Sequence, residues 1–253
     1  MKCLNKILKP TSGRILIDGE DVEGMSYKDV SKLVGYVPTS SEDAFSMPVF
    51  DAILIGRYNH HHWGSEEKDL EMVYKAMELM HIRGLASKGF NELSAGQHQK
   101  ALIARGLVQD TPVLILDEPT SNLDVKYQIY VSELLRAMAE FHNMIIIMIS
   151  HDLNITARYS NQIIMMSRPG IVYRMGIPSE VLTVENIQAV YGIDCRIFDD
   201  NGAPHIVLGK ARIDEDCDDY CAGTHQNTTL LKLKRPWKNR RVHISDNGNE
   251  RGE

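Results

Sequence analysis

Two adjacent carboxylates follow a short and strongly apolar segment of the sequence. Residues 114–116 are Leu-Ile-Leu, and Asp117, Glu118 and Pro119 come directly after them. Such a run is typical of a buried parallel strand, and α/β sheets bind ligands at the carboxyl ends of their strands. One carboxylate there suits Mg²⁺, which prefers oxygen ligands, and the next could orient or deprotonate an attacking water molecule. An ordinary strand that ends in an acidic turn would look the same, so the motif alone does not decide.

A histidine follows a second apolar segment. Residues 145–149 are Ile-Ile-Ile-Met-Ile, and Ser150, His151 and Asp152 come next. An imidazole at the tip of a neighbouring strand could contact a phosphate and the water molecule that attacks it. A single histidine in such a place is more often structural, so His151 gains meaning only from its neighbours.

Small residues and a hydroxyl group open a helical segment. Ser94, Ala95, Gly96 and Gln97 begin a helical pattern that runs to about Gln109. Backbone N–H groups and the positive end of the helix dipole favour phosphate at such a start. The same residues would also suit an ordinary N-cap at Ser94.

The elements that position these groups alternate along the chain. Between residues 14 and 38, short β-like runs and turn signals predict a small sheet around one short helix with Ser26 as its N-cap. Residues 45–109 have a helical pattern and form a predicted helical subdomain. Later apolar runs are separated by helical periods and lie at residues 113–116, 144–149 and 162–166. We therefore predict an α/β fold whose parallel sheet is covered on both faces.

Composition and charge narrow the classes of function. The 253 residues are 43% hydrophobic and 25% charged, as in an ordinary globular protein, and the four cysteines are too few for a disulfide framework. The longest strongly apolar stretch, residues 144–149, is far shorter than the roughly 20 residues that cross a bilayer. The N-terminus lacks the apolar core of a secretion signal. A net charge of −6 argues against nucleic acid as a partner. We expect a cytoplasmic protein whose membrane role depends on a partner.

The order of the motifs resembles the ATP-binding cassette (ABC) family. Residues 93–97, Asp117-Glu118, residues 121–124 and His151 are similar to its signature loop, second carboxylate motif, D-loop and switch histidine, in that order. The resemblance covers residues 1 to 195 and implies the P-loop NTPase-type parallel sheet core with a helical subdomain at about 45–109. Beyond it we expect a short C-terminal extension at 196–210 and a mobile tail at 211–253, because helical periodicity disappears there.

The resemblance implies roles for individual residues, with ATP and Mg²⁺ as cofactors. Asp117 would hold Mg²⁺, Glu118 would be the catalytic base, and His151 would position the γ-phosphate. Asp124 would lie at the seam between two subunits, because these ATPases work as head-to-tail dimers. The residues that would bind the ATP held by the opposite subunit are Ser94, Ala95, Gly96 and Gln97, of which the serine and glycine would contact its γ-phosphate.

The sequence departs from the family pattern in two places. Residues 2–13 resemble the segment directly after the family's glycine-rich loop, so we expect the N-terminal strands and the P-loop to be missing and ATP to bind poorly. Thr39 stands where the family has a glutamine that contacts Mg²⁺ and the attacking water. Threonine is shorter and could reach Mg²⁺ only through a water molecule.

Two further segments indicate a group within the family. Residues 46–60 and residues 180–192 are similar to segments of importers for ferric siderophores, haem and cobalamin. The resemblance therefore implies an ATP-hydrolysing subunit that forms a homodimer on the inner face of the membrane. Its partners would be transmembrane permease subunits and, indirectly, a substrate-binding protein.

Alternative interpretations remain open. The missing loop and Thr39 would also suit a degenerate, non-hydrolysing regulatory subunit or a gene fragment. A cassette protein without a transport role is the other alternative. Such proteins usually carry two cassettes or a long coiled coil, and neither pattern occurs in this sequence.

Overall fold

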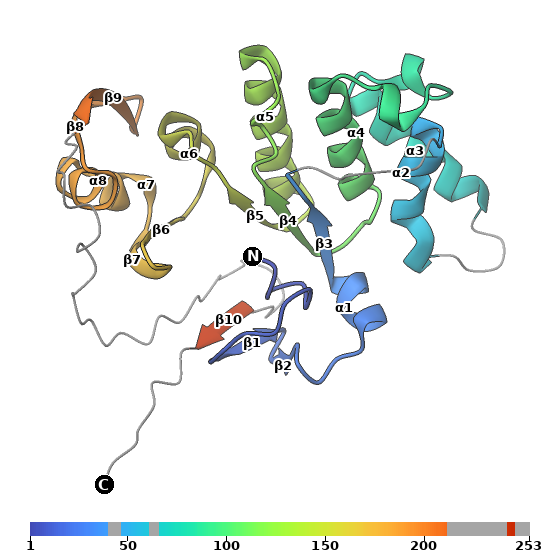
Figure 1. Cartoon of the computed structure of the whole chain (residues 1–253), viewed down its shortest axis with the longest axis horizontal. Helices are drawn as coiled ribbons and strands as arrows, with labels where there is room; N and C mark the ends of the chain where they lie inside the picture. Colours follow the sequence, from blue (N-terminus) through green and yellow to red (C-terminus); the bar gives the residue numbers. More distant parts are fainter. Residues whose placement is uncertain (40–46, 61–65, 212–241, 246–253) are drawn as a thin grey trace, which may run out of the picture. The chain divides into compact units, whose positions relative to one another are not determined.

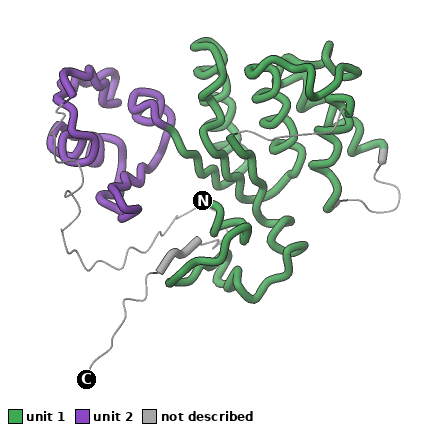
Figure 2. The backbone as a smooth tube through the Cα atoms, in the orientation of Figure 1, with its two compact units in different colours: residues 1–150, 230–247 green, residues 151–229, 248–253 purple. Residues whose placement is uncertain are grey.

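The chain folds into two compact units (Figure 2). The first unit is residues 1–150 with 230–247, and the second is residues 151–229 with 248–253. The computed structural model describes residues 1–39, 47–60, 66–211 and 242–245. Within these ranges no helix combines the length and the apolar character that crossing a membrane requires.

A parallel sheet forms the centre of the first unit (Figure 1). It consists of β3 (Val34–Val37), β4 (Val113–Asp117) and β5 (Ile145–Ile149), which lie side by side in this order. The strands are parallel, with Val34 opposite Val113 and Asp117 opposite Ile149. The predicted parallel sheet is therefore confirmed for these three segments, and their carboxyl ends share one edge.

Both faces of this sheet are covered, as predicted. Leu114 and Leu116 point to one face and pack with α2 to α5, whereas Val113 and Ile115 point to the other face and pack with the N-terminal segment. This alternation follows from the two-residue period of a strand. Figure 1 shows α4 and α5 on one side of the sheet and the segment that carries β1, β2 and α1 on the other.

The predicted helical subdomain contains α-helices linked by short 3₁₀ turns. Its elements are α2 (Val49–Leu54), η1 (Ile55–His60), α3 (Glu66–Leu79), η2 (Arg83–Leu85), η3 (Phe90–Glu92) and α4 (Ala95–Leu107). A buried ion pair joins η1 to α3, with Arg57 Nε 2.7 Å from Asp69 Oδ1. The guanidinium also donates to the carbonyl of Val108, which follows α4, at 2.9 Å. One arginine therefore links η1, α3 and the end of α4.

The N-terminal segment forms a separate antiparallel sheet. Its order is β10-β1-β2, from Val242–Ser245, Arg14–Ile17 and Glu20–Asp21. Helix α1 (Tyr27–Leu33) begins as predicted after Ser26, whose hydroxyl accepts from the Asp29 N–H at 3.1 Å. The prediction of one small sheet over residues 14–38 is wrong, because β3 joins the parallel sheet. Val34 and Val37 are buried, and a side chain at Gly35 would collide with Thr111, so β3 suits a sheet that is covered on both faces.

The second unit combines short helices with antiparallel strand pairs. In chain order it contains α6 (Leu153–Tyr159), β6 (Ile163–Ser167), β7 (Ile171–Gly176), α7 (Pro178–Val181), α8 (Val184–Tyr191), β8 (Ile193–Asp200) and β9 (Ala203–Ala211). The strands pair as β6 with β7 and β8 with β9, both antiparallel. The core of this unit contains Ala157, Ile163, Met165, Val181, Leu182, Ile187 and Ile206.

Two expectations concern the second half of the chain. The apolar run at 162–166 was expected in the parallel sheet, and this is wrong, because β6 pairs antiparallel with β7. Its burial alternates, and Met166 is exposed, as in a sheet with one solvated face. Most of the expected tail at 211–253 lies outside the described residues, and within it Val242–Ser245 forms β10.

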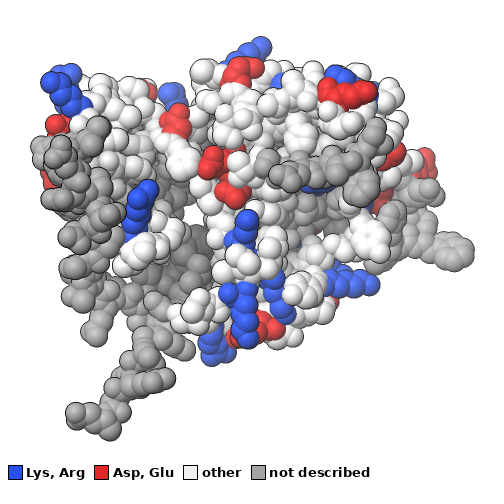
Figure 3. All heavy atoms as spheres, viewed as in Figure 1, with Lys and Arg blue, Asp and Glu red and all other residues white. Residues whose placement is uncertain are grey.

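Charged side chains of both signs lie together on the face in Figure 3. Lys and Arg side chains gather there around the segment that carries β1, β2 and α1, beside Asp and Glu side chains. Lys9 lies 2.7 Å from Glu23, and Arg14 lies 3.1 Å from Asp21. The hydrogen bond and the charge of Glu23 raise the pKa of Lys9. Positive charge in this region is therefore matched locally by negative charge.

Candidate functional site

Asp117 and Glu118 lie at the carboxyl edge of the parallel sheet, as predicted. Asp117 is the last residue of β4, and its Cα partner on β5 is Ile149. Glu118 begins the following turn with a φ of 48°, a left-handed conformation that residues other than glycine rarely adopt. The Glu118 carbonyl accepts from the Ser121 hydroxyl at 3.0 Å and from the Ser121 N–H at 3.3 Å. The turn therefore separates two partly exposed carboxylates that are adjacent in sequence.

Tyr36 is a member of this edge that the sequence analysis did not select. Its hydroxyl donates to Asp117 Oδ2 over a long 3.5 Å. Burial raises the pKa of Tyr36, and the negative charge of Asp117 and this hydrogen bond raise it further. Tyr36 therefore stays a neutral donor beside the carboxylate. The sequence does place Tyr36 in an apolar strand. Predicting its contact with Asp117 would also have required knowing that this strand lies beside β4.

The start of α4 has the geometry of a capping box. The Ser94 hydroxyl accepts from the Gln97 N–H at 3.4 Å, and Gln97 Oε1 accepts from the Ser94 N–H at 3.2 Å. Ser94 and Ala95 are exposed. An α-helix leaves its first N–H groups without partners inside the helix, so this start can present donors to an anion. The Gln97 side chain itself caps the helix.

The D-loop residues contact the start of α4 and the start of α5 (Val125–Phe141). A Cβ atom at Gly96 would lie 3.1 Å from the carbonyl oxygen of Asn122, so only a small residue fits there without movement. Asp124 is the exposed N-cap of α5, and its carboxylate accepts from the Tyr127 N–H at 3.1 Å. The structure therefore brings together two of the predicted loops, the one at 94–97 and the one at 121–124.

The remaining predicted residues are Thr39 and His151. Thr39 is partly exposed, lies just beyond the end of β3, and is the last described residue before the gap at 40–46. His151 is exposed and is the first residue of the second unit, two positions after Ile149. Within the first unit the structure joins Asp117 with Tyr36 and Gly96 with Asn122, whereas His151 belongs to the other unit.

The donor chemistry of the edge fits a magnesium-bound nucleotide. Among the described residues there is no group of three or more His, Cys, Asp or Glu that could hold a metal ion. Mg²⁺ usually binds to one or two carboxylates and takes its other ligands from phosphate and water. Asp117 and Glu118 offer such a set at the end of β4. The edge therefore suits Mg²⁺ that arrives with a phosphate ligand better than a metal site made wholly by protein.

Comparisons with known proteins find relatives that match most of the chain. A family model described as ABC transporter matches residues 1–121. An ABC transporter ATP-binding protein of Methanocaldococcus jannaschii is 43% identical over 207 residues, which are 82% of this chain and 80% of that protein. The ferric enterobactin transport ATP-binding protein of Escherichia coli is 34% identical over 217 residues, which are 83% of this chain and 79% of that protein.

A solved structure extends the similarity to the fold. It is an inward-facing conformation of a metal-chelate type ABC transporter, with a TM-score of 0.62 and 27% identity. The match covers 70% of this chain and 72% of the other chain. The sequence comparison and the structure comparison therefore both find similarity to ABC transporter proteins.

Proposed function

The chain belongs to the ATP-binding proteins of the ABC transporter family, whose ATPase activity is coupled to transport, and we propose that it energises an importer for ferric siderophores, haem or cobalamin. The observation that carries the proposal is the pair of carboxylates at the end of the buried strand β4, beside the β5 strand that leads to His151. Similarity to a ferric enterobactin transport protein supports the choice of cargo.

The edge carboxylates divide the work of hydrolysis between them. Asp117 would hold Mg²⁺, which would neutralise negative charge on the phosphates of ATP. Glu118 orients the attacking water molecule and accepts its proton, and His151 contacts the γ-phosphate. Thr39 would reach Mg²⁺ only through a water molecule. The left-handed turn at Glu118 supports different roles for the two acids, because it directs neighbouring side chains differently from a regular strand.

The active assembly is a head-to-tail homodimer. The start of α4, with Ser94, Ala95, Gly96 and Gln97, contacts the ATP bound to the opposite subunit, and Asp124 lies at the seam. Two observations support this arrangement: Ser94, Ala95 and Asp124 are exposed, and Gly96 packs against the D-loop at Asn122. The dimer binds transmembrane permease subunits at the inner face of the cell membrane. Through them it serves a substrate-binding protein.

Two substitutions in the protein expressed from its full reading frame test the proposal. Glu118→Gln keeps the size of the side chain but removes the base, so phosphate release should slow by about 100-fold or more. Dimerisation on addition of ATP and Mg²⁺, measured by light scattering, should persist. Ser94→Arg should show the opposite defect, with ATP bound by a monomer that does not dimerise.

The matched control is Glu71→Gln, which makes the same chemical change on the exposed face of α3. It should leave hydrolysis unchanged. Parent-like turnover by the Glu118→Gln variant would refute the role of the base. A parent protein that binds but does not hydrolyse ATP would instead favour a regulatory subunit.

A further inference from the structure

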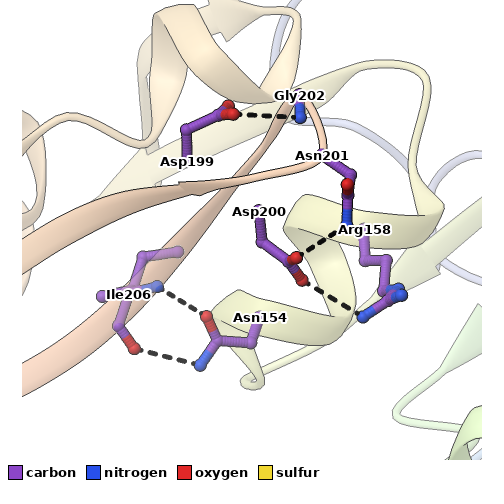
Figure 4. A network of polar contacts seen from close by, with 7 residues as sticks. All are labelled: Asn154, Arg158, Asp199, Asp200, Asn201, Gly202 and Ile206. Carbon is purple, nitrogen blue, oxygen red and sulfur yellow. Dashed lines mark hydrogen bonds and ion pairs between the residues drawn. The ribbon is translucent and has the colours of Figure 1, made fainter.

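An asparagine of α6 pairs with the backbone of β9 (Figure 4). Asn154 Oδ1 accepts from the Ile206 N–H at 2.7 Å, and Asn154 Nδ2 donates to the Ile206 carbonyl at 3.1 Å. The side-chain amide therefore satisfies both backbone groups of one residue, as a neighbouring strand would. Asn154 lies three positions after His151 in the sequence.

The register of the hairpin explains why Ile206 can accept this partner. Ile206 lies opposite Ile197 in the antiparallel β8–β9 pair. Residues of such a pair alternate, and every second one directs its N–H and C=O away from the partner strand. Because Asn154 binds both the N–H and the C=O of Ile206, these two backbone groups point to the outer edge of β9, away from β8. An amide offers one donor and one acceptor there, whereas aspartate offers no donor and leucine offers neither.

The hairpin is a firm attachment point for α6. Ile206 is 3% exposed and belongs to the core of the second unit, together with Val181, Leu182 and Ile187. The Asn154 side chain is only partly exposed, so solvent competes weakly for its two hydrogen bonds. A substitution at Asn154 would therefore weaken the attachment of the first turn of α6 to β9.

The first turn of α6 is also hydrogen-bonded to Asp152, the residue that follows His151. Asp152 is the N-cap, and its carboxylate accepts from the N–H groups of Asn154 and Ile155, both at 2.9 Å. The Thr156 hydroxyl donates to the Asp152 carbonyl at 2.7 Å. A helix of seven residues is too short to be stable by itself, so tertiary contacts must hold α6 in place.

A second link between α6 and the hairpin is weaker. Arg158 Nη1 lies 3.4 Å from Asp200 Oδ2, and the two side chains are 62% and 46% exposed. Asn201 also donates to Asp200, and Asp199 accepts from the Gly202 N–H, so these contacts mainly shape the hairpin turn (Figure 4). Exposed ion pairs contribute little. The amide of Asn154 is therefore the main polar attachment between the two elements.

We propose that Asn154 is a positioning residue for His151. Its amide fixes the first turn of α6 to β9 and thereby orders Asp152 and the histidine that precedes it. The β8–β9 hairpin therefore contributes to the placement of His151. The inference rests on the proposed contact of His151 with the γ-phosphate. It assigns a part in ATP hydrolysis to a side chain that touches neither nucleotide nor metal.

The test compares Asn154→Leu with the matched control Asn186→Leu in the full chain. Asn186 also lies in the second unit and donates its side-chain amide to a backbone carbonyl, that of Val181, at 2.9 Å. Asn154→Leu should raise hydrogen exchange of the amides of residues 151–157 by about 10-fold or more. It should lower kcat for ATP by about 10-fold and change KM by less than about 2-fold. Asn186→Leu should change neither readout.

Asn154→Asp serves as a second variant that keeps the size and the acceptor but loses the donor, and it should behave in the same direction if the leucine variant does not fold. Equal losses of kcat in the Asn154 and Asn186 variants would overturn the proposal, because they would indicate general destabilisation. Unchanged exchange over residues 151–157 in both Asn154 variants would also overturn it. His151→Ala tests the proposed function separately: if this variant hydrolyses ATP like the parent, the role of the histidine fails, while the exchange data still decide whether Asn154 orders residue 151.

Discussion

An ion pair inside the first unit and an ion pair inside the second unit differ greatly in burial. In the first unit, the side chains of Arg57 and Asp69 are 8% and 1% exposed and lie 2.7 Å apart. In the second unit, those of Arg158 and Asp200 are 62% and 46% exposed and lie 3.4 Å apart. A buried charge pair tolerates little change, whereas an exposed pair can break at low cost. The comparison therefore sets a pair whose loss should destabilise its unit against a pair whose loss should have little effect.

The apolar contacts show the same difference. In β4 of the first unit, Leu114, Ile115 and Leu116 are fully buried between two packed faces. In the second unit, Tyr173 of β7 and Phe198 of β8 are 44% and 53% exposed. The carboxylates thus follow a deeply buried strand, whereas His151 precedes a helix that is attached to a hairpin with both buried and exposed apolar side chains.

Breaking the buried pair should have the largest effect. Arg57→Met removes the cation beside Asp69 and the donor to the Val108 carbonyl, so the free energy of unfolding should fall by about 3–5 kcal/mol. Urea unfolding at neutral pH measures the change. Combining Arg57→Met with Asp69→Leu should recover much of the loss. A decrease below about 1 kcal/mol for the single variant would contradict the expected large effect of the buried pair.

Removing the half-buried hydroxyl at the carboxyl edge should have a smaller effect. Tyr36→Phe loses the hydrogen bond to Asp117 and should cost about 0.5–1 kcal/mol at neutral pH. Because the pKa of Tyr36 is raised above its ordinary value near 10, its contribution is complete below that value and is lost as pH rises through the folded-state pKa. Unfolding experiments from pH 8 upward should show the parent and the variant converging. Parallel curves at all pH values would contradict this assignment.

The smallest effect is expected for the exposed pair of the second unit. Arg158→Met should change the free energy of unfolding by less than about 0.5 kcal/mol, because the pair is largely solvated. Thermal unfolding at low and high salt measures the change, and salt should reduce any difference. A loss comparable to that of Arg57→Met would show that the two units do not differ in the way their polar contacts suggest.

Local signals made much of the first unit predictable. The helical period expected between the apolar runs at 113–116 and 144–149 is α5, and the helix expected after Ser26 is α1, because N-caps and apolar periodicity act within a few residues. The position of Asp117 and Glu118 at a strand end followed from the apolar run before them. The contact of Tyr36 with Asp117 did not follow, because it depends on β3 lying beside β4.

Long-range pairing accounts for the features that the sequence did not reveal. The hydrogen-bond partner of Asn154 is 52 residues away in the sequence, on β9, and no short motif predicts this contact. The pairing of β10 with β1 joins residues near opposite ends of the chain, and β6 pairs with β7 although its apolar run resembles a parallel strand. Such contacts depend on loop closure and on competing strands, which a window of sequence does not contain.

The left-handed backbone at Glu118 sets two kinds of selection against each other. A residue with a side chain is strained in this conformation by about 1 kcal/mol, whereas glycine adopts it freely. If Glu118 is the catalytic base, as proposed above, hydrolysis requires a carboxylate there, so activity and stability favour different residues at the same position. A library selected only for resistance to heat would therefore enrich glycine at residue 118 and lose ATPase activity. The stability of this turn is then lower than it could be because catalysis needs a carboxylate.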